Sequence, residues 1–252
     1  MTQTDNSIKV DEQKPRASVS SNNATGSVDN ATGTLNNATG TLNKATGTLK
    51  RINADDIHSM DQRQRVHFIN SLSGYKSANI IGTQNQNGAT NACIVSSVIH
   101  LGADPALIAF INRPHTAERN TLDNIYQTGV YTVNHVNSTI FEDAHHTSAR
   151  YPAAISEFDQ TSLCEYYTDF AAPYVQQSRI KMGVEFRQKI DIELNGTVMI
   201  IGEIVEVLLE PELIADDGKI DLVAAKTVAV SGLDEYHIAT SLGRLEYAKP
   251  RE

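Results

Sequence analysis

The sequence predicts a mainly β domain with peripheral helices, an α+β chain whose antiparallel, Greek-key-like strands form a closed or partly closed barrel. Two hairpin turns, Asn87-Gly88 and Asn195-Gly196, each stand between strand-like runs. Most other strands are joined by turns or by one short helix at irregular intervals. A doubly wound parallel sheet would instead show a regular strand–helix repeat, so the antiparallel barrel is favoured.

The first fifty residues differ in composition from the rest of the chain. Residues 23–48 contain ATG four times in a seven-residue unit close to NATGTLN. Each unit has one large apolar residue and one glycine, whereas a coiled coil needs two apolar positions per heptad, and a helical glycine costs about 1 kcal/mol. A short β-solenoid would need longer units. We therefore expect residues 1–50 to form a disordered or weakly ordered tail, and residues 51–252 to form the domain.

The first half of the domain predicts two helices and three strands. Residues 55–74 carry spaced apolar residues and predict a helix with its exit near Gly74. Residues 77–99 predict a strand–turn–strand hairpin, and ALIAFIN at 106–112 has the length of a buried strand. Residues 116–129 predict a helix that begins at an N-cap Thr116 and ends before Gly129.

The second half predicts a further strand, a helical segment and a long hairpin. VYTVNHV at 130–136 is the strand, and STIFEDAHHTSARY at 138–151 is the helical segment. Residues 153–178 are irregular and rich in aromatic side chains. The hairpin spans 186–209, because apolar residues alternate up to Asn195-Gly196 and a long apolar strand returns. Short strands follow within 215–222 and 226–239.

Composition limits the classes of partner. The formal charge of -9 argues against nucleic acid and acidic membrane surfaces, which usually require a basic patch. The chain has no apolar run of membrane-spanning length and begins with a polar segment, so we expect a cytoplasmic protein. Cys93 and Cys164 lack metal-ligand spacing and are expected to be buried free thiols. Common nucleotide, hydrolase and metal motifs are missing, and no metal site is expected.

Small polar residues interrupt an otherwise apolar strand in GATNACIVSSVIHLGADP, residues 88–105. Asn91, Ser96 and Ser97 are the interruptions that bear on function. The simpler interpretation is that they form the solvent face of a half-buried strand. The alternative is that small side chains let the strand approach a flat ligand closely.

A cluster of cationic and hydroxyl side chains follows in RPHTAERNT, residues 113–121, at the start of the predicted helix. A helix N-terminus offers unpaired N–H groups and a partial positive charge, and Arg113 and Arg119 would add two full charges. This arrangement suits a phosphate. The alternative is that both arginines are surface residues paired with Glu118 or Asp123.

The run NACIVSSVIHLGADPALIAFINRPHTAERNTLDNIYQTGVYTVNHV contains, in order, a strand, a proline-containing turn, a strand, an arginine-bearing loop, a helix and a TGxYTVN strand. In this order it closely resembles the flavin reductase-like family, whose fold is the FMN-binding split β-barrel. AHHTSARY, SEF, the NGT hairpin, SGLDEYH and GRLEYA are similar to the branch of that family with a longer C-terminal half. The resemblance covers about residues 55–250, and the first fifty residues have no counterpart in it.

The resemblance implies a homodimer that holds FMN non-covalently in a groove at the subunit interface. It places Asn91, Ser96 and Ser97 along the isoalloxazine and ribityl chain, where backbone amides would face the flavin N5 and O4 edge. The residues implied to hold the phosphate are Arg113, His115, Arg119 and Thr121. Asn134 on the following strand is expected to close the pocket.

The implied activity is that of a flavin reductase, an FMN-dependent NAD(P)H:flavin oxidoreductase. NADH or NADPH would donate a hydride to flavin N5, and the reduced flavin could supply a partner oxygenase. Because the cofactors carry this chemistry, no catalytic dyad is required. We expect His145 to line the nicotinamide side, with Tyr236 and His237 as weaker candidates. The alternative function is a non-catalytic FMN-binding protein that carries electrons or senses redox state.

Overall fold

The computed structural model describes residues 49–113, 120–152 and 154–250. Residues 51–252 cluster as one unit, and the following description concerns this unit. The repeat-containing tail lies outside the described residues except for Leu49 and Lys50, as does the predicted N-cap Thr116.

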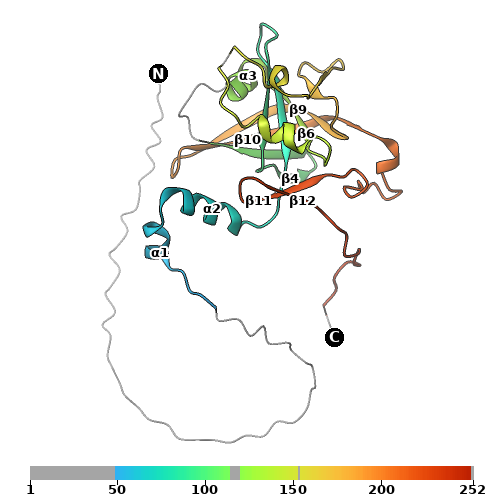
Figure 1. Cartoon of the computed structure of the whole chain (residues 1–252). Helices are drawn as coiled ribbons and strands as arrows, with labels where there is room; N and C mark the ends of the chain where they lie inside the picture. Colours follow the sequence, from blue (N-terminus) through green and yellow to red (C-terminus); the bar gives the residue numbers. More distant parts are fainter. Residues whose placement is uncertain (1–48, 114–119, 153, 251–252) are drawn as a thin grey trace, which may run out of the picture. The chain divides into compact units, whose positions relative to one another are not determined.

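A seven-stranded antiparallel sheet forms the body of the domain (Figure 1). Its strands pair in the order β3-β2-β6-β9-β10-β5-β4, and every pairing in it is antiparallel. The sequence prediction of an antiparallel β fold is therefore confirmed. The strands are β2 (Asn79–Gln84), β3 (Thr90–Val95), β4 (Ile99–Ala103), β5 (Ala106–Asn112), β6 (Val130–His135), β9 (Ile180–Ile192) and β10 (Thr197–Leu209).

Glycines with positive φ end the elements where the sequence predicts turns. Gly88, at φ 83°, lies in the β2–β3 turn, and Gly196, at φ 70°, lies in the β9–β10 turn. Gly129, at φ 73°, follows helix α3 (Asn120–Thr128). A left-handed backbone favours glycine, so these residues fix where each hairpin or helix stops. The two predicted hairpins and the helix end are confirmed.

Two elements differ from the sequence prediction. Residues 55–74 form two helices, α1 (Ala54–Ser59) and α2 (Gln62–Leu72), because the Asp61 side chain accepts a hydrogen bond from Gln64 N and begins a new helix. The second strand of the first hairpin ends at Val95. After residues 96–98 the chain forms β4, which the sequence did not separate from β3 and which stands at the other end of the strand order. Because the link has only three residues, the two ends of the sheet lie close together.

Smaller elements cover one side of the main sheet. A three-stranded sheet has the order β1-β11-β12, and a two-stranded sheet joins β7 to β8. Figure 1 shows β11 and β12 on the side of the main strands opposite to α3. The bounds are β1 (Lys76–Ser77), α4 (Phe141–His146), η1 (Glu157–Gln160), β7 (Glu165–Tyr166), β8 (Tyr174–Val175), η2 (Pro211–Leu213), β11 (Val228–Ser231) and β12 (Glu235–Ile238).

Two large apolar clusters lie on either side of β3. One cluster packs Leu122 of α3 against Phe110 and Tyr131 of the main sheet. The other packs Ala144 of α4 against Ala92 of β3, together with residues of β11. Strand β3 therefore has a rigid support on both sides. No helix in the part of the chain that the structure describes has the length and apolar character to cross a membrane.

Candidate functional site

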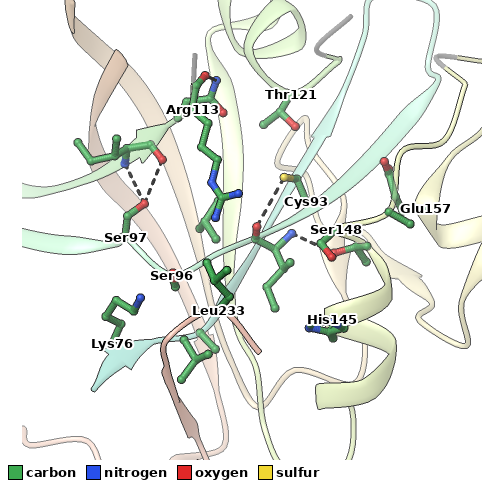
Figure 2. Close-up of a pocket in the computed structure, with 18 of the residues that line it drawn as sticks. Lys76, Cys93, Ser96, Ser97, Arg113, Thr121, His145, Ser148, Glu157 and Leu233 are labelled. Atoms are coloured by element: carbon green, nitrogen blue, oxygen red, sulfur yellow. Dashed lines mark hydrogen bonds between the residues drawn. The ribbon is translucent and has the colours of Figure 1, made fainter. Parts of the chain in front are cut away.

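One cavity of about 600 Å³ runs along β3 (Figure 2). Its wall is formed by β3 and the following Ser96-Ser97 link, the end of β5, the start of α3 and the end of α4. Strand β1, helix α2, the 3-10 helix η1 and the β11–β12 hairpin also contribute lining residues. The cavity therefore lies where segments from most of the domain meet.

Six of the predicted site residues line this single cavity: Asn91, Ser96, Ser97, Arg113, Thr121 and His145. They come from five parts of the sequence, so the fold brings these separate segments together at one cavity. His115 and Arg119 lie outside the described residues.

Asn134 does not line the cavity, and its predicted role in closing the pocket is corrected. The side chain is fully buried, and its amide donates to Ile80 O at 3.1 Å and to Thr132 Oγ1 at 2.8 Å. Its oxygen accepts from Val175 N at 3.0 Å. Two of these bonds join β6 to β2 and β8, and the bond to Thr132 lies within β6, so Asn134 holds the core together and does not face a ligand.

Asn91 and Thr121 join β3 to the first turn of α3. The Asn91 amide donates to Thr121 Oγ1 at 2.8 Å, and both side chains are buried. A hydroxyl that accepts one bond still has a proton to donate. Thr121 can therefore donate into the cavity at the position where α3 begins.

The hydroxyl of Ser97 replaces a main-chain group in the β4–β5 ladder. Ile99 pairs with Ala109, so Ser97 stands opposite Ile111 if the register is continued. Both main-chain bonds of Ile111 go to the Ser97 side chain: Ser97 Oγ donates to Ile111 O and accepts from Ile111 N, each at 3.0 Å. Ser97 is thus committed to the fold, whereas the Ser96 hydroxyl has no hydrogen bond among the described residues.

The Ser97 side-chain bridge leaves main-chain donors open at the cavity. The N–H groups of Ser96 and Ser97 have no partner within the described ranges, because the chain has left β2 and does not pair directly with β5. Buried main-chain donors are nearly always paired. Two adjacent free N–H groups in a cavity wall are therefore suited to an acceptor atom of a ligand.

Charged groups are unevenly placed around the cavity. Lys76, Arg113 and Arg150 are its cationic lining residues, and Glu157 is the carboxylate among the described lining residues. Figure 2 shows the Arg113 side chain reaching from the end of β5 into the cavity toward Ser96, with Glu157 on the opposite side. The lining thus carries more positive than negative charge in a chain whose formal net charge is -9.

Glu157 is a partly buried carboxyl group at the cavity wall. One carboxyl oxygen accepts a hydrogen bond from Ala92 N at 3.0 Å. Burial raises the pKa of Glu157 above its ordinary value of 4.5, and the main-chain bonds oppose that rise only in part. The folded state therefore favours the protonated form of Glu157 more than the unfolded state does.

Glu157→Gln is expected to increase thermal stability more at pH 7 than at pH 4. Because the pKa of Glu157 is higher in the folded state than in the unfolded state, the folded chain binds more protons near this pH. The contribution of Glu157 to the free energy of unfolding therefore falls as the pH rises through and above 4.5. Glutamine keeps an acceptor for Ala92 N without the charge. Melting temperatures of the variant and of Glu193→Gln, an exposed turn control, would be compared at both pH values. A pH-independent difference at position 157 would contradict the prediction.

His145 and Tyr236 form a hydrogen-bonded pair in the cavity lining. His145 Nδ1 lies 3.0 Å from the Tyr236 hydroxyl, and the rings meet edge to face with centroids 5.7 Å apart. Burial and the nearby Asp234 raise the pKa of Tyr236, which keeps its proton. When this hydroxyl donates to Nδ1, the neutral imidazole carries its proton on Nε2.

His237 lies on the other face of β12 from Tyr236 and outside the cavity lining. Its Nε2 lies 2.8 Å from Ser231 Oγ, and its ring contacts Tyr75 with centroids 4.8 Å apart. Successive strand residues point to opposite faces, so only one of the two candidates could face the cavity.

Several lining residues were not predicted from the sequence, among them Lys76, Cys93 and Glu157. For Cys93 a signal existed, because Asn91, Cys93 and Val95 alternate along β3 and all three line the cavity. The expectation that both thiols are buried is wrong for Cys164, which is exposed, while Cys93 is partly exposed. Neither cysteine forms a disulfide.

The comparisons with known proteins agree with this fold. The family model "Flavin reductase like domain" matches residues 74–231. The chain is 51% identical to a crystal structure described as a putative flavin reductase with split barrel domain from Shewanella frigidimarina, with a TM-score of 0.77 over 79% of this chain and 100% of that one. A comparison with curated proteins finds no match.

Two more distant structures share the fold. Nitrilotriacetate monooxygenase component B from Bacillus cereus is 17% identical, with a TM-score of 0.70 over 79% of this chain and all of that one. Flavoredoxin of Desulfovibrio vulgaris (Miyazaki F) is 18% identical, with a TM-score of 0.61 over 69% of this chain and 92% of that one. At these identities the likeness concerns the fold alone.

Proposed function

The chain belongs to the flavin reductase-like family, and from this we propose that it is an FMN-dependent NAD(P)H:flavin oxidoreductase. The family supports a flavin-related redox function. FMN as the bound flavin, and NADH or NADPH as the hydride donor, are the finer parts of the proposal. The observation that carries it is the cavity along β3, which combines open main-chain donors with cationic side chains.

The residues present in the cavity suit a flavin phosphate ester. Its volume of about 600 Å³ is within the range of pockets that bury cofactor-sized ligands. The wall along β3 has small side chains at Cys93, Ser96 and Ser97, which leaves room for a flat ring beside the strand. The unpaired N–H groups of Ser96 and Ser97 match the acceptor-rich edge of such a ring, and Arg113 matches an anionic end.

The protein residues have distinct roles in this proposal. Asn91 and Thr121 orient the start of α3 relative to β3, and Thr121 offers a donor there. His145 presents a ring whose orientation is fixed by Tyr236, on the side where we place the nicotinamide. When bound, the flavin would supply the hydride-accepting chemistry, so the side chains need only bind, orient and exclude water.

We include a homodimer in the proposal. Exposed apolar residues occur on α2, where Ile69 is 45% exposed and also lines the cavity, and in the C-terminal segment at Leu242, Leu245 and Tyr247. Exposed apolar groups that border a ligand cavity are suited to burial by a second copy of the chain. A size-exclusion measurement of molar mass tests this, and a monomer at micromolar concentration would contradict it. A cytoplasmic location and supply of a partner oxygenase stay predictions from the sequence.

Anaerobic mixing of the FMN-loaded protein with NADH or NADPH is expected to bleach the flavin absorbance. This measurement separates the reductase from the alternative FMN-binding electron carrier or redox sensor. The same protein reduced by dithionite serves as the control for complete bleaching. Absence of bleaching with either nucleotide, while dithionite bleaches fully, would contradict the reductase and favour the carrier.

A further inference from the structure

Glu157 is bonded to the outer edge of β3, the strand at one end of the main sheet. Strand β3 pairs with β2 on one side only, so the N–H groups on its other side need different partners. Ala92 N donates to Glu157 Oε2 at 3.0 Å. Two residues further on, Ile94 N donates to Thr147 Oγ1 at 2.9 Å. The N–H of Ser96 is the next in this alternating row and is open to the cavity within the described ranges, so Glu157 holds the edge that presents this donor.

Glu157 is also the carboxylate among the described residues that line the cavity. In Figure 2 it lies on the same side of the cavity as Ser148 and His145, across from Arg113. No cation of the described residues forms an ion pair with it, although Arg150 lines the same cavity. The side chain is partly buried, and burial raises its pKa. When ionised, Glu157 is therefore a poorly screened negative charge at the cavity wall.

The Glu157 carboxylate lies beside the stretch of β3 where the proposed function places the flavin ring. Its partner Ala92 directly precedes Cys93, whose small side chain leaves room for the ring. A strand rises about 3.3 Å per residue, so Ala92 N lies about 13 Å along β3 from Ser96 N. A ring that accepts a hydrogen bond at Ser96 and extends toward Cys93 therefore approaches Glu157. In a partly buried cavity, charges at such separations interact more strongly than in bulk water.

Reduction of a flavin changes the charge that faces this carboxylate. A hydride brings one proton and an electron pair, so the ring gains one negative charge and keeps it until it binds a further proton. An anionic group beside the ring opposes that gain, whereas a neutral group of the same shape does not. Loss of the Glu157 charge would therefore favour reduced flavin over oxidised flavin.

We propose that Glu157 weakens the binding of reduced FMN relative to oxidised FMN, and thereby keeps the bound flavin a stronger reductant. This inference rests on the proposed function and adds a residue that tunes the redox chemistry of the same site. The effect acts through charge, because a neutral acceptor at position 157 could hold Ala92 N equally well.

The ratio of the dissociation constants of reduced and oxidised FMN tests the proposal. Potentiometric titration with and without the protein gives this ratio, with dithionite as the reductant and at pH 8, where Glu157 is more fully ionised. In Glu157→Gln the ratio is expected to fall about tenfold, which for a two-electron couple raises the midpoint potential by about 30 mV. Glutamine keeps the shape and the acceptor for Ala92 N, so the variant should fold. Glu157→Asp keeps the charge, and its ratio should stay closer to that of the wild type.

Glu165→Gln is the matched control. Glu165 lies on β7 outside the cavity lining, and its Oε1 accepts a hydrogen bond from Thr90 Oγ1 of β3 at 2.6 Å. This variant removes the same charge from a carboxylate bonded to the same strand, and the ratio should change by less than about twofold. An equal fall in both variants would show an effect of net charge and would overturn the local role of Glu157.

The remaining outcomes separate this inference from the proposed function. An unchanged ratio in Glu157→Gln overturns the inference, and so does a rise, which would mean that a protonated Glu157 donates to the reduced ring. Because dithionite supplies the electrons, the ratio is measurable even if neither NADH nor NADPH reduces the protein and the reductase function fails. A wild type that binds no FMN overturns both.

Discussion

Replacing Arg113 with alanine is expected to raise the dissociation constant for FMN by about ten- to a hundredfold. Hydrogen bonds to charged groups contribute about 1.5–3 kcal/mol, and 1.4 kcal/mol corresponds to a factor of ten. Riboflavin lacks the phosphate, so its affinity should change by less than about twofold. Both constants can be measured by titrating flavin fluorescence.

Arg187→Ala provides the control for loss of an arginine. Arg187 lies on β9 outside the cavity lining and pairs with Glu185 and Glu203. Its replacement should leave both flavin affinities unchanged. If Arg113→Ala weakened FMN and riboflavin equally, Arg113 would not bind the phosphate.

Gly82→Ala is expected to lower the free energy of unfolding by about 2–5 kcal/mol. A Cβ at Gly82 would overlap Pro173 O and Thr132 Oγ1, and these two atoms are already joined by a 2.6 Å hydrogen bond. Overpacking costs about 1–3 kcal/mol, and loss of a buried hydrogen bond costs a similar amount. For a domain of this size, each kcal/mol lowers the melting temperature by about 2–4 °C.

Gly102→Ala is a matched control on β4. A Cβ there meets only Pro105 O at 3.5 Å, which is an ordinary contact. Its melting temperature should change by no more than a few degrees. Equal melting temperatures for the two variants would contradict the prediction, because they would show that Thr132 and Pro173 can move away from a Cβ at position 82 without loss of stability.

The antiparallel framework could be predicted from sequence because its signals are local. Alternating apolar residues and an Asn-Gly pair define each hairpin within about twenty residues, and the structure confirms both hairpins. The break between β3 and β4 has no such local signal in the sequence. It depends on the Ser97 hydroxyl bonding Ile111, and a serine in a strand looks the same whether it faces solvent or the main chain of another strand.

The cavity residues that could be predicted are likewise those with a local sequence signal. Asn91 and Arg113 could be predicted because polar and cationic groups stood out beside apolar strands. Asn134 looked equivalent in the sequence, but its side-chain oxygen accepts a hydrogen bond from Val175 N of β8. Strand β8 has only two residues and no sequence pattern that predicts it. Lys76 was missed because one of its anchors, Gly232, is 156 residues away. Contacts of that separation are determined by tertiary structure.

The Ser97 bridge also makes the width of the cavity adjustable by a single side chain. Because a hydroxyl occupies the ladder position opposite Ile111, the main chain at Ser97 stands one side-chain length away from β5. Threonine could keep that spacing, whereas alanine would remove the spacer and let the link move toward β5 or lose contact with it. Changes at position 97 therefore offer a route to retune which ring sizes this site admits, without altering any residue that we expect to contact the phosphate.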